Sequence, residues 1–168
     1  TIQYTFTKKV FKKEKFEEIS NLAIRKNWIN NHLSTGATPY SYCYGSINSC
    51  FGWRCSEIAI ENQDLDVVVT IKNESRKVIR HAYIRAGNRF TFSIPDGSYQ
   101  VFFYFGKGWN PNKIVSTKPC RIKGGFISKE SIGKDDYISL SNQRLTYSFN
   151  LSYGGNFNME DADLVEAF

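Results

Sequence analysis

The chain has 168 residues, of which 41% are hydrophobic and 15% aromatic, so it can build one hydrophobic core and is not a disordered protein. No apolar stretch approaches the roughly 20 residues that a membrane-spanning helix needs. The net charge of +6 makes a nucleic-acid partner an alternative, but no recognisable nucleic-acid-binding motif accompanies the basic residues, and we expect no nucleic-acid partner.

The N-terminal segment, residues 1–36, predicts a short strand followed by a helix. Ile2, Tyr4 and Phe6 alternate with polar residues, as in a strand with one buried face. Between residues 12 and 33, apolar residues recur instead every three or four positions, which predicts an amphipathic helix. Because one helix cannot fold alone, we expect it to pack on the main domain, on a second copy of the chain, or on a missing partner segment.

Residues 37–168 predict a mainly β domain. Short strands are expected at 57–61, 66–72, 78–85 and 90–94. The strand expected at 99–105 is apolar on both faces, as in a central strand, and glycine-rich loops are expected from 106 to 136. The last strand is expected at 145–153, and the apolar residues of the tail (Leu164, Val165 and Phe168) are expected to dock back.

These elements predict a single β-sandwich of the Ig-like or transthyretin-like kind, with one N-terminal helix. Turns are expected at 73–76, at 86–88 and at Pro95-Asp96-Gly97. In the last of these, Pro95 fixes one φ angle and Gly97 is expected to adopt a positive φ angle.

The four cysteines favour disulfides. Cys43, Cys50 and Cys55 lie in one loop and Cys120 follows far downstream, whereas a zinc site would favour closer pairs supported by histidine. We expect two of the loop cysteines to pair with each other and the third to pair with Cys120. Such bonds are typical of oxidising compartments, so an extracytoplasmic location is expected; four reduced thiols in a cytosolic protein are the alternative.

The sequence offers little catalytic chemistry. The only histidines are His32 and His81, no Gly-x-Ser-x-Gly motif is present, and His81 is expected to form a hydrogen bond at the surface of a strand. The pairs Asp64/Asp66 and Asp135/Asp136 lack the spacing of a calcium-binding loop. We therefore expect no enzymatic activity, no cofactor and no metal.

Residues 84–110, with Ile94-Pro95-Asp96-Gly97-Ser98-Tyr99 and the later Gly106 and Trp109, follow an "aGxxxxxxiPxGxYxvxyxxGxxW" pattern. This resembles a group of uncharacterised bacterial β-sandwich domains, and its turn also occurs in transthyretin-like and carboxypeptidase-regulatory-like sandwiches. Gly155-Asn156-Phe157 and Phe168 look similar to the end of some members. The resemblance spans residues 57–168 and implies a sandwich attached to the bacterial envelope, often behind a membrane segment. It implies no activity.

Loop aromatics are the remaining candidates for a binding site. Flat aromatic faces beside amides are what a sugar or peptide groove uses, and the candidates are Tyr44, Trp53, Trp109 and Asn110. The alternative is that these aromatics cap one end of the sandwich as part of its core. The expected function is a non-enzymatic structural or protein-interaction module of the bacterial cell envelope, with a protein or glycan partner or self-association through the N-terminal helix. A carbohydrate- or peptide-binding module is the alternative. Because the chain begins at Thr1 without Met, we expect a mature or trimmed form.

Overall fold

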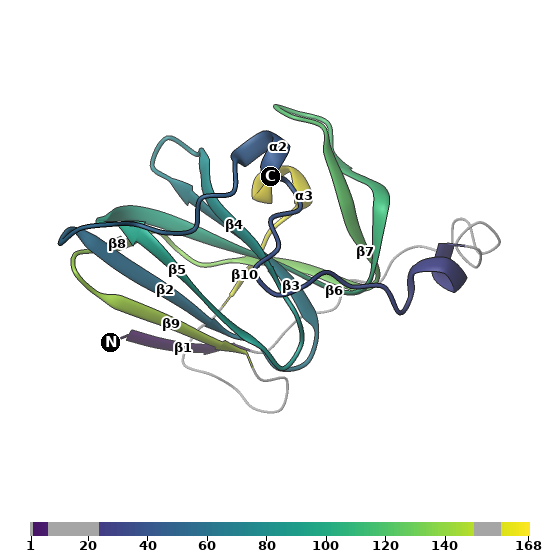
Figure 1. Cartoon of the computed structure of the whole chain (residues 1–168), viewed down its shortest axis with the longest axis horizontal. Helices are drawn as coiled ribbons and strands as arrows, with labels where there is room; N and C mark the ends of the chain where they lie inside the picture. The colour runs from purple at the N-terminus through teal and green to yellow at the C-terminus, as the bar shows by residue number, and fades with distance from the viewer. Residues whose placement is uncertain (1, 7–23, 150–158) are drawn as a thin grey trace.

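The computed structural model describes residues 2–6, 24–149 and 159–168, in which two β-sheets pack face to face (Figure 1). The smaller sheet has the order β1 (Ile2–Phe6), β9 (Arg144–Phe149), β2 (Cys55–Glu61) and β5 (Arg89–Pro95). The larger has the order β10 (Glu160–Asp161), β7 (Ile122–Lys134), β6 (Gly97–Ser116), β3 (Asp66–Asn73) and β4 (Val78–Ile84), with β8 (Ile138–Leu140) paired to β6. The predicted mainly β fold of two sheets is confirmed.

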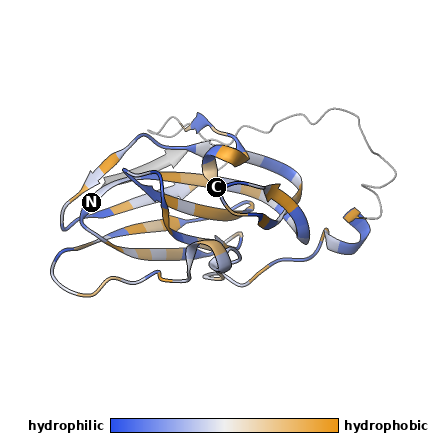
Figure 2. Cartoon of the chain, turned by 90° about the horizontal axis from the view of Figure 1, so that it is seen from above, coloured by the Kyte–Doolittle hydropathy of each residue, from blue (hydrophilic) through white to orange (hydrophobic). Residues whose placement is uncertain are grey.

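The predicted strands and hairpins between residues 55 and 105 are confirmed. β3 and β4 form an antiparallel hairpin around the expected turn, and β5 pairs antiparallel with β2. In β5, Phe92 and Ile94 are buried while Thr91 is exposed, as the alternation of apolar and polar residues indicates. This alternation is also visible along the strands in Figure 2, where apolar and polar residues follow one another. β1 joins this sheet by pairing parallel with β9.

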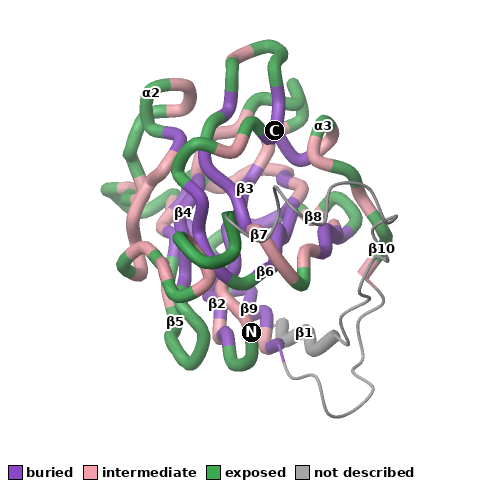
Figure 3. The backbone as a smooth tube through the Cα atoms, turned by 90° about the vertical axis from the view of Figure 1, so that its right-hand side faces the viewer, coloured by how far each residue is buried: buried purple, intermediate pink, exposed green. Residues whose placement is uncertain are grey.

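The main hydrophobic core lies between the two sheets. It is built from side chains on the inner faces of β2, β5 and β9 opposite those of β3, β4 and β6, with Ile58, Phe92, Tyr147, Val69 and Phe103 among its fully buried members. Figure 3 shows these buried stretches running along the strands. This face-to-face packing is what makes the alternating strands of the sequence stable.

A second hydrophobic core covers the outer face of the larger sheet. Two short helices, α2 (Ser41–Tyr44) and α3 (Leu164–Ala167), lie side by side over this face (Figure 1). Tyr40 and Phe168 pack there against Tyr104 and Trp109. Because β6 has a core on each side, its residues 101–106 are all buried, which confirms the predicted central strand.

The expectation of glycine-rich loops from 106 to 136 is wrong, since β6 continues to Ser116 and β7 occupies Ile122–Lys134. The glycines permit close packing instead of ending the strands. A Cβ atom at Gly106 would lie 2.2 Å from the Cβ atom of Phe126 on the neighbouring strand. The register between β6 and β7 shifts between Phe105 and Lys107, and Gly108, just after this shift, has a φ angle of +74°.

The remaining expectations concern the turn at Gly97 and the two ends of the chain. Gly97 is the first residue of β6 and does not adopt the positive φ angle that was expected. Of the predicted N-terminal helix, residues 24–28 are helical, and the part before residue 24 lies outside the described residues. Two other predicted features also lie outside them: the end of the strand expected at 145–153 and the stretch Gly155-Asn156-Phe157. In the tail, Phe168 is buried as expected, Leu164 is half-buried, and Val165 is exposed.

Candidate functional site: an aromatic loop at one end of the sandwich

The four cysteines form two disulfides, Cys43–Cys120 and Cys50–Cys55. The expected scheme, with one bond inside the loop and one from the loop to Cys120, is confirmed. The first bond ties α2 to the segment between β6 and β7. The second closes residues 50–55, which we call the aromatic loop, into a small ring.

Residues 45–49 lead to the aromatic loop along the open side of the sandwich, as the dark blue segment running left from α2 in Figure 1 shows. Asn48 joins the edge strands of both sheets: its carbonyl oxygen accepts a hydrogen bond from the Ser93 N–H in β5 (3.1 Å), and its side-chain amide donates to the His81 carbonyl in β4 (3.1 Å). The Arg80 guanidinium donates to the carbonyl oxygens of Ser49 (3.1 Å) and Ser93 (3.2 Å). These bonds satisfy edge groups that would otherwise be open to pairing with another chain.

The aromatic loop is fixed to the turns that surround it. The Asp96 N–H donates to the Arg54 carbonyl oxygen (3.0 Å). The Asp96 carboxylate accepts hydrogen bonds from the Ser56 hydroxyl (2.6 Å) and the Asn142 N–H (2.9 Å), which lower the pKa of Asp96. The loop is therefore held at its base by the disulfide and by hydrogen bonds on both sides.

Two aromatic side chains project from this fixed base. Phe51 is 93% exposed and Trp53 is 80% exposed, the highest values among the large hydrophobic side chains of the described residues. Gly52 between them has a φ angle of +116°, a conformation that suits glycine and not residues with a Cβ atom. The Arg54 guanidinium lies 4.5 Å from the centre of the Trp53 ring, within the range of a cation–π interaction.

Basic residues share this end of the sandwich. The strand register places the β3–β4 turn, with Arg76 and Lys77, at the same end as the aromatic loop, because Asn73 pairs with Tyr99 and Cys55 pairs with Pro95. Arg54, Arg76 and Lys77 are all exposed, while Arg144 at the start of β9 forms an ion pair with Glu57 (3.3 Å).

The other predicted binding residues do not join Trp53. Trp109 is only 2% exposed, and its ring packs against Tyr83 and Phe126, so it belongs to the core, which is the alternative weighed for these aromatics. Asn110 is also buried, and the hydroxyl of Tyr44 donates to the Phe168 carbonyl oxygen (2.8 Å). Sequence reasoning missed Phe51, although its place beside Trp53 in a tightly spaced cysteine pair was a usable signal.

His81 is buried and structural, contrary to the expectation of a surface position. It is 1% exposed, and its Nε2 atom accepts a hydrogen bond from the Tyr40 N–H (3.0 Å). Burial disfavours the charged imidazolium and lowers the pKa of His81 to about 4. Near neutral pH the ring is therefore uncharged and serves to hold residue 40 against β4.

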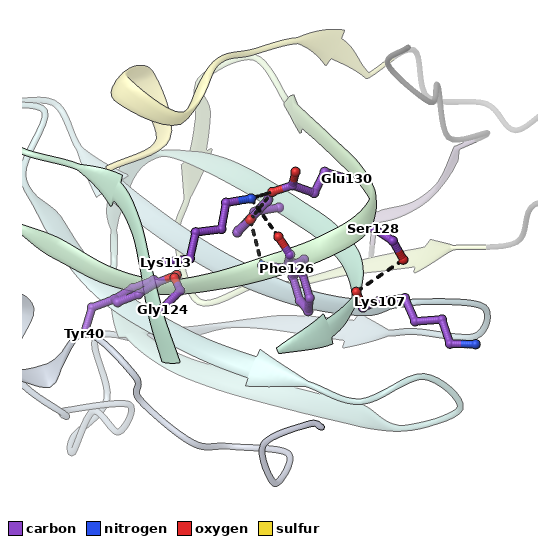
Figure 4. Close-up of polar contacts among 8 residues, drawn as sticks. Tyr40, Lys107, Lys113, Gly124, Phe126, Ser128 and Glu130 are labelled. Carbon is purple, nitrogen blue, oxygen red and sulfur yellow. Dashed lines mark hydrogen bonds and ion pairs between the residues drawn. The ribbon is translucent and has the colours of Figure 1, made fainter. Parts of the chain in front are cut away.

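A polar cluster on the outer face of β6 and β7 is a second place where charged groups gather (Figure 4). The Tyr104 hydroxyl donates to Glu130 (2.6 Å) and accepts from the Phe126 N–H (2.9 Å), while Lys113 forms an ion pair with Glu130 and donates to the Phe126 carbonyl oxygen (2.7 Å). A cavity of about 260 Å³ beside this cluster is lined in part by Arg25, Tyr104 and Glu130. These groups bind one another, so the cluster supports the bend of the long hairpin.

Across residues 2–6, 24–149 and 159–168, no group of three or more His, Cys, Asp or Glu side chains is placed to hold a metal ion. Two of the acidic residues that were weighed as calcium ligands form hydrogen bonds with protein groups. Asp66 accepts from the Tyr83 hydroxyl and the Ala86 N–H, and Asp135 accepts from the Tyr147 hydroxyl.

In the described part of the chain, no helix has the length and apolar character to cross a bilayer. Comparisons with known proteins find no matching family model, no similar curated protein and no similar solved structure. The resemblance carried by residues 84–110 therefore stays a prediction.

Proposed function

We propose that this chain is a non-enzymatic interaction module of the cell envelope that contacts its partner through the aromatic loop. The observation that carries the proposal is the exposure of Phe51 and Trp53 on a loop that a disulfide and the Asp96 hydrogen bonds hold in place.

When a partner covers an exposed aromatic pair, apolar surface is removed from water and the free energy of the complex is lowered. Burying an aromatic side chain is worth about 1.5–3 kcal/mol, and Trp and Arg are enriched among the residues that dominate binding energy. The Cys50–Cys55 bond limits the conformations that the loop loses on binding. The loop therefore combines a large apolar contribution with a small entropic cost.

The two disulfides support an oxidising location, because such bonds are rare in the cytosol. Within that class of location, we assign the chain to the bacterial cell envelope, which is what the resemblance of residues 84–110 implies. The same resemblance favours the transthyretin-like or Ig-like kind of sandwich. Self-association through the N-terminal helix rests on residues 12–23, which lie outside the described residues, and it stays a prediction.

The absence of enzymatic activity is supported by the state of the groups that could act as nucleophiles or bases. Every cysteine is in a disulfide, and the buried His81 nitrogen is already engaged by the Tyr40 N–H. No thiol is therefore free to act as a nucleophile, and the exposed His32 has no free cysteine to activate.

Carbohydrate binding is a second candidate, favoured by the exposed indole of Trp53. Because Arg54 lies over one side of this ring, a sugar would stack on the other. Of the candidates Tyr44, Trp53 and Trp109, only Trp53 is exposed, which makes carbohydrate binding the weaker proposal.

Site-specific photocrosslinking in the native host tests the proposal. Benzoylphenylalanine at position 51 should give adducts that the same residue at position 137 or 165 does not give, since all three positions are exposed but only the first lies in the aromatic loop. Equal adducts from all three positions, or none from position 51, would contradict the proposed contact site.

A further inference from the structure

Resting on the proposed function, we infer that the partner of the aromatic loop is the surface of an anionic lipid bilayer. Phe51 and Trp53 enter the interfacial region of the bilayer, and the basic residues at the same end of the sandwich contact the lipid headgroups. The shape, size and charge of this end carry the inference.

The aromatic loop is a projection and not a groove. The two apolar side chains project from a loop that the Cys50–Cys55 disulfide closes at its base, immediately before β2 begins at Cys55. A bilayer interface accepts such side chains without a preformed pocket, and Trp is enriched there because its ring is apolar while its N–H stays hydrated. The fixed base allows both aromatics to enter together.

The aromatic loop alone is smaller than an ordinary protein interface. Its two aromatic side chains offer roughly 300–500 Å² together, so a protein partner that buries about 800 Å² on each side would also have to cover surface outside the loop. Among the described residues, the other exposed large hydrophobic side chains lie outside the loop, at Ile24, Tyr42, Ile47, Ile114, Tyr137 and Val165. Binding to a bilayer needs only a few inserted side chains together with electrostatic attraction, so the aromatic loop fits a bilayer better than a protein partner.

The charge at this end complements an anionic membrane. Arg54, Arg76 and Lys77 are exposed, and the whole chain carries a net charge of +6. Two carboxylates share this end: Asp96, which accepts hydrogen bonds from Ser56 and Asn142, and the exposed Glu74 in the same turn as Arg76 and Lys77, so the basic side chains outnumber the acidic ones by three to two. Each basic side chain near anionic lipids strengthens binding several-fold, and salt weakens this contribution.

Vesicle binding tests the inference directly. The protein is mixed with phosphatidylcholine vesicles that do or do not contain phosphatidylglycerol, and the bound fraction is measured by sedimentation. We expect binding to the anionic vesicles, and a loss of about tenfold or more in affinity for each of Phe51→Ser and Trp53→Ser. Val165→Ser is the matched control, because Val165 is 72% exposed on α3, away from the loop. This variant should bind the vesicles with the same affinity as the unsubstituted protein.

The expected result includes a blue shift of tryptophan emission on binding that is lost in Trp53→Phe, since Trp109 is buried in both states and Trp28 lies outside the aromatic loop. The inference is overturned if the unsubstituted protein does not bind anionic vesicles, or if Phe51→Ser and Val165→Ser bind equally. Failure of vesicle binding together with protein or glycan adducts from position 51 would reject the bilayer and leave the proposed function standing. Failure of both experiments would reject both.

Discussion

The backbone N–H of Tyr40 donates a hydrogen bond of 3.0 Å to Nε2 of His81, and the two rings stack with their centroids 5.7 Å apart. This contact joins the segment that leads into the cysteine-rich loop to the middle of β4. Because Tyr40 also packs on Phe168, one uncharged imidazole links the N-terminal covering segment, the edge of the larger sheet and the C-terminal tail.

The neutral state of His81 makes stability depend on pH. Its pKa is about 4 in the folded protein and about 6.5 when unfolded, so the unfolded chain binds more protons between these values. This contribution is present above pH 6.5 and is lost as pH falls toward 4. Between pH 7 and pH 5 we expect a loss of about 2 kcal/mol from this group.

Urea denaturation of the protein and of His81→Gln at both pH values measures this loss. The carboxylates titrate in both proteins, so the difference between the two pH dependences isolates His81. An identical pH dependence in the two proteins would contradict a buried neutral histidine.

The two disulfides should differ in their effect on stability. Their cysteines are 77 and 5 residues apart, and in the chain-entropy model the longer closure stabilises by about 4 kcal/mol and the shorter by about 2 kcal/mol. Chemical denaturation of the double variants Cys43→Ser/Cys120→Ser and Cys50→Ser/Cys55→Ser checks this. A larger loss in the free energy of unfolding for Cys50→Ser/Cys55→Ser than for Cys43→Ser/Cys120→Ser would contradict this expectation.

Trp53 and Trp109 provide a matched pair of substitutions. Trp109→Ala should cost about 3–5 kcal/mol, because it removes a side chain that packs on Tyr83 and Phe126 in the second core. Trp53→Ala should change stability by less than about 0.5 kcal/mol, because the ring is exposed. Equilibrium unfolding of both variants gives the comparison, and similar losses would mean that one ring is misplaced.

The aromatic loop should bind vesicles more weakly when its Cys50–Cys55 disulfide is removed, even though Phe51 and Trp53 are still present. In Cys50→Ser/Cys55→Ser, the loop must lose more conformational freedom on binding, so weaker binding to the phosphatidylglycerol vesicles is expected. Cys43→Ser/Cys120→Ser serves as the control, provided that the experiment is run where both variants are folded. Equal binding by the two variants would remove the argument for a preformed loop.

Strands with one buried face could be predicted from the sequence because their pattern is local. Phe92 and Ile94 in β5, or Leu145 and Tyr147 in β9, alternate with polar residues at the spacing that the pleat requires. Gly106 and Gly133 mislead for the opposite reason. Their role depends on Phe126 and on Met159, which pack where a Cβ atom would be, and no local pattern reveals those neighbours.

The candidate site was half predictable. The cysteine spacing indicated a bond inside the loop and one to Cys120, and the structure assigns Cys43 as the partner of Cys120. The sequence does not distinguish Trp53 from Trp109, since both follow glycine and stand near turn-forming residues. Only the second core, built from the outer face of β6 and the two short helices, decides that Trp109 is buried.

The central claim is that a closed Cys50–Cys55 ring presents Phe51 and Trp53, because the loop geometry, its affinity and the oxidising location all depend on that bond. The most direct test is the intact mass of the protein taken from its host into a thiol-blocking reagent without reductant. We expect no labelled cysteine before reduction and four after it. Four labels before reduction would contradict the closed loop and the oxidising compartment together.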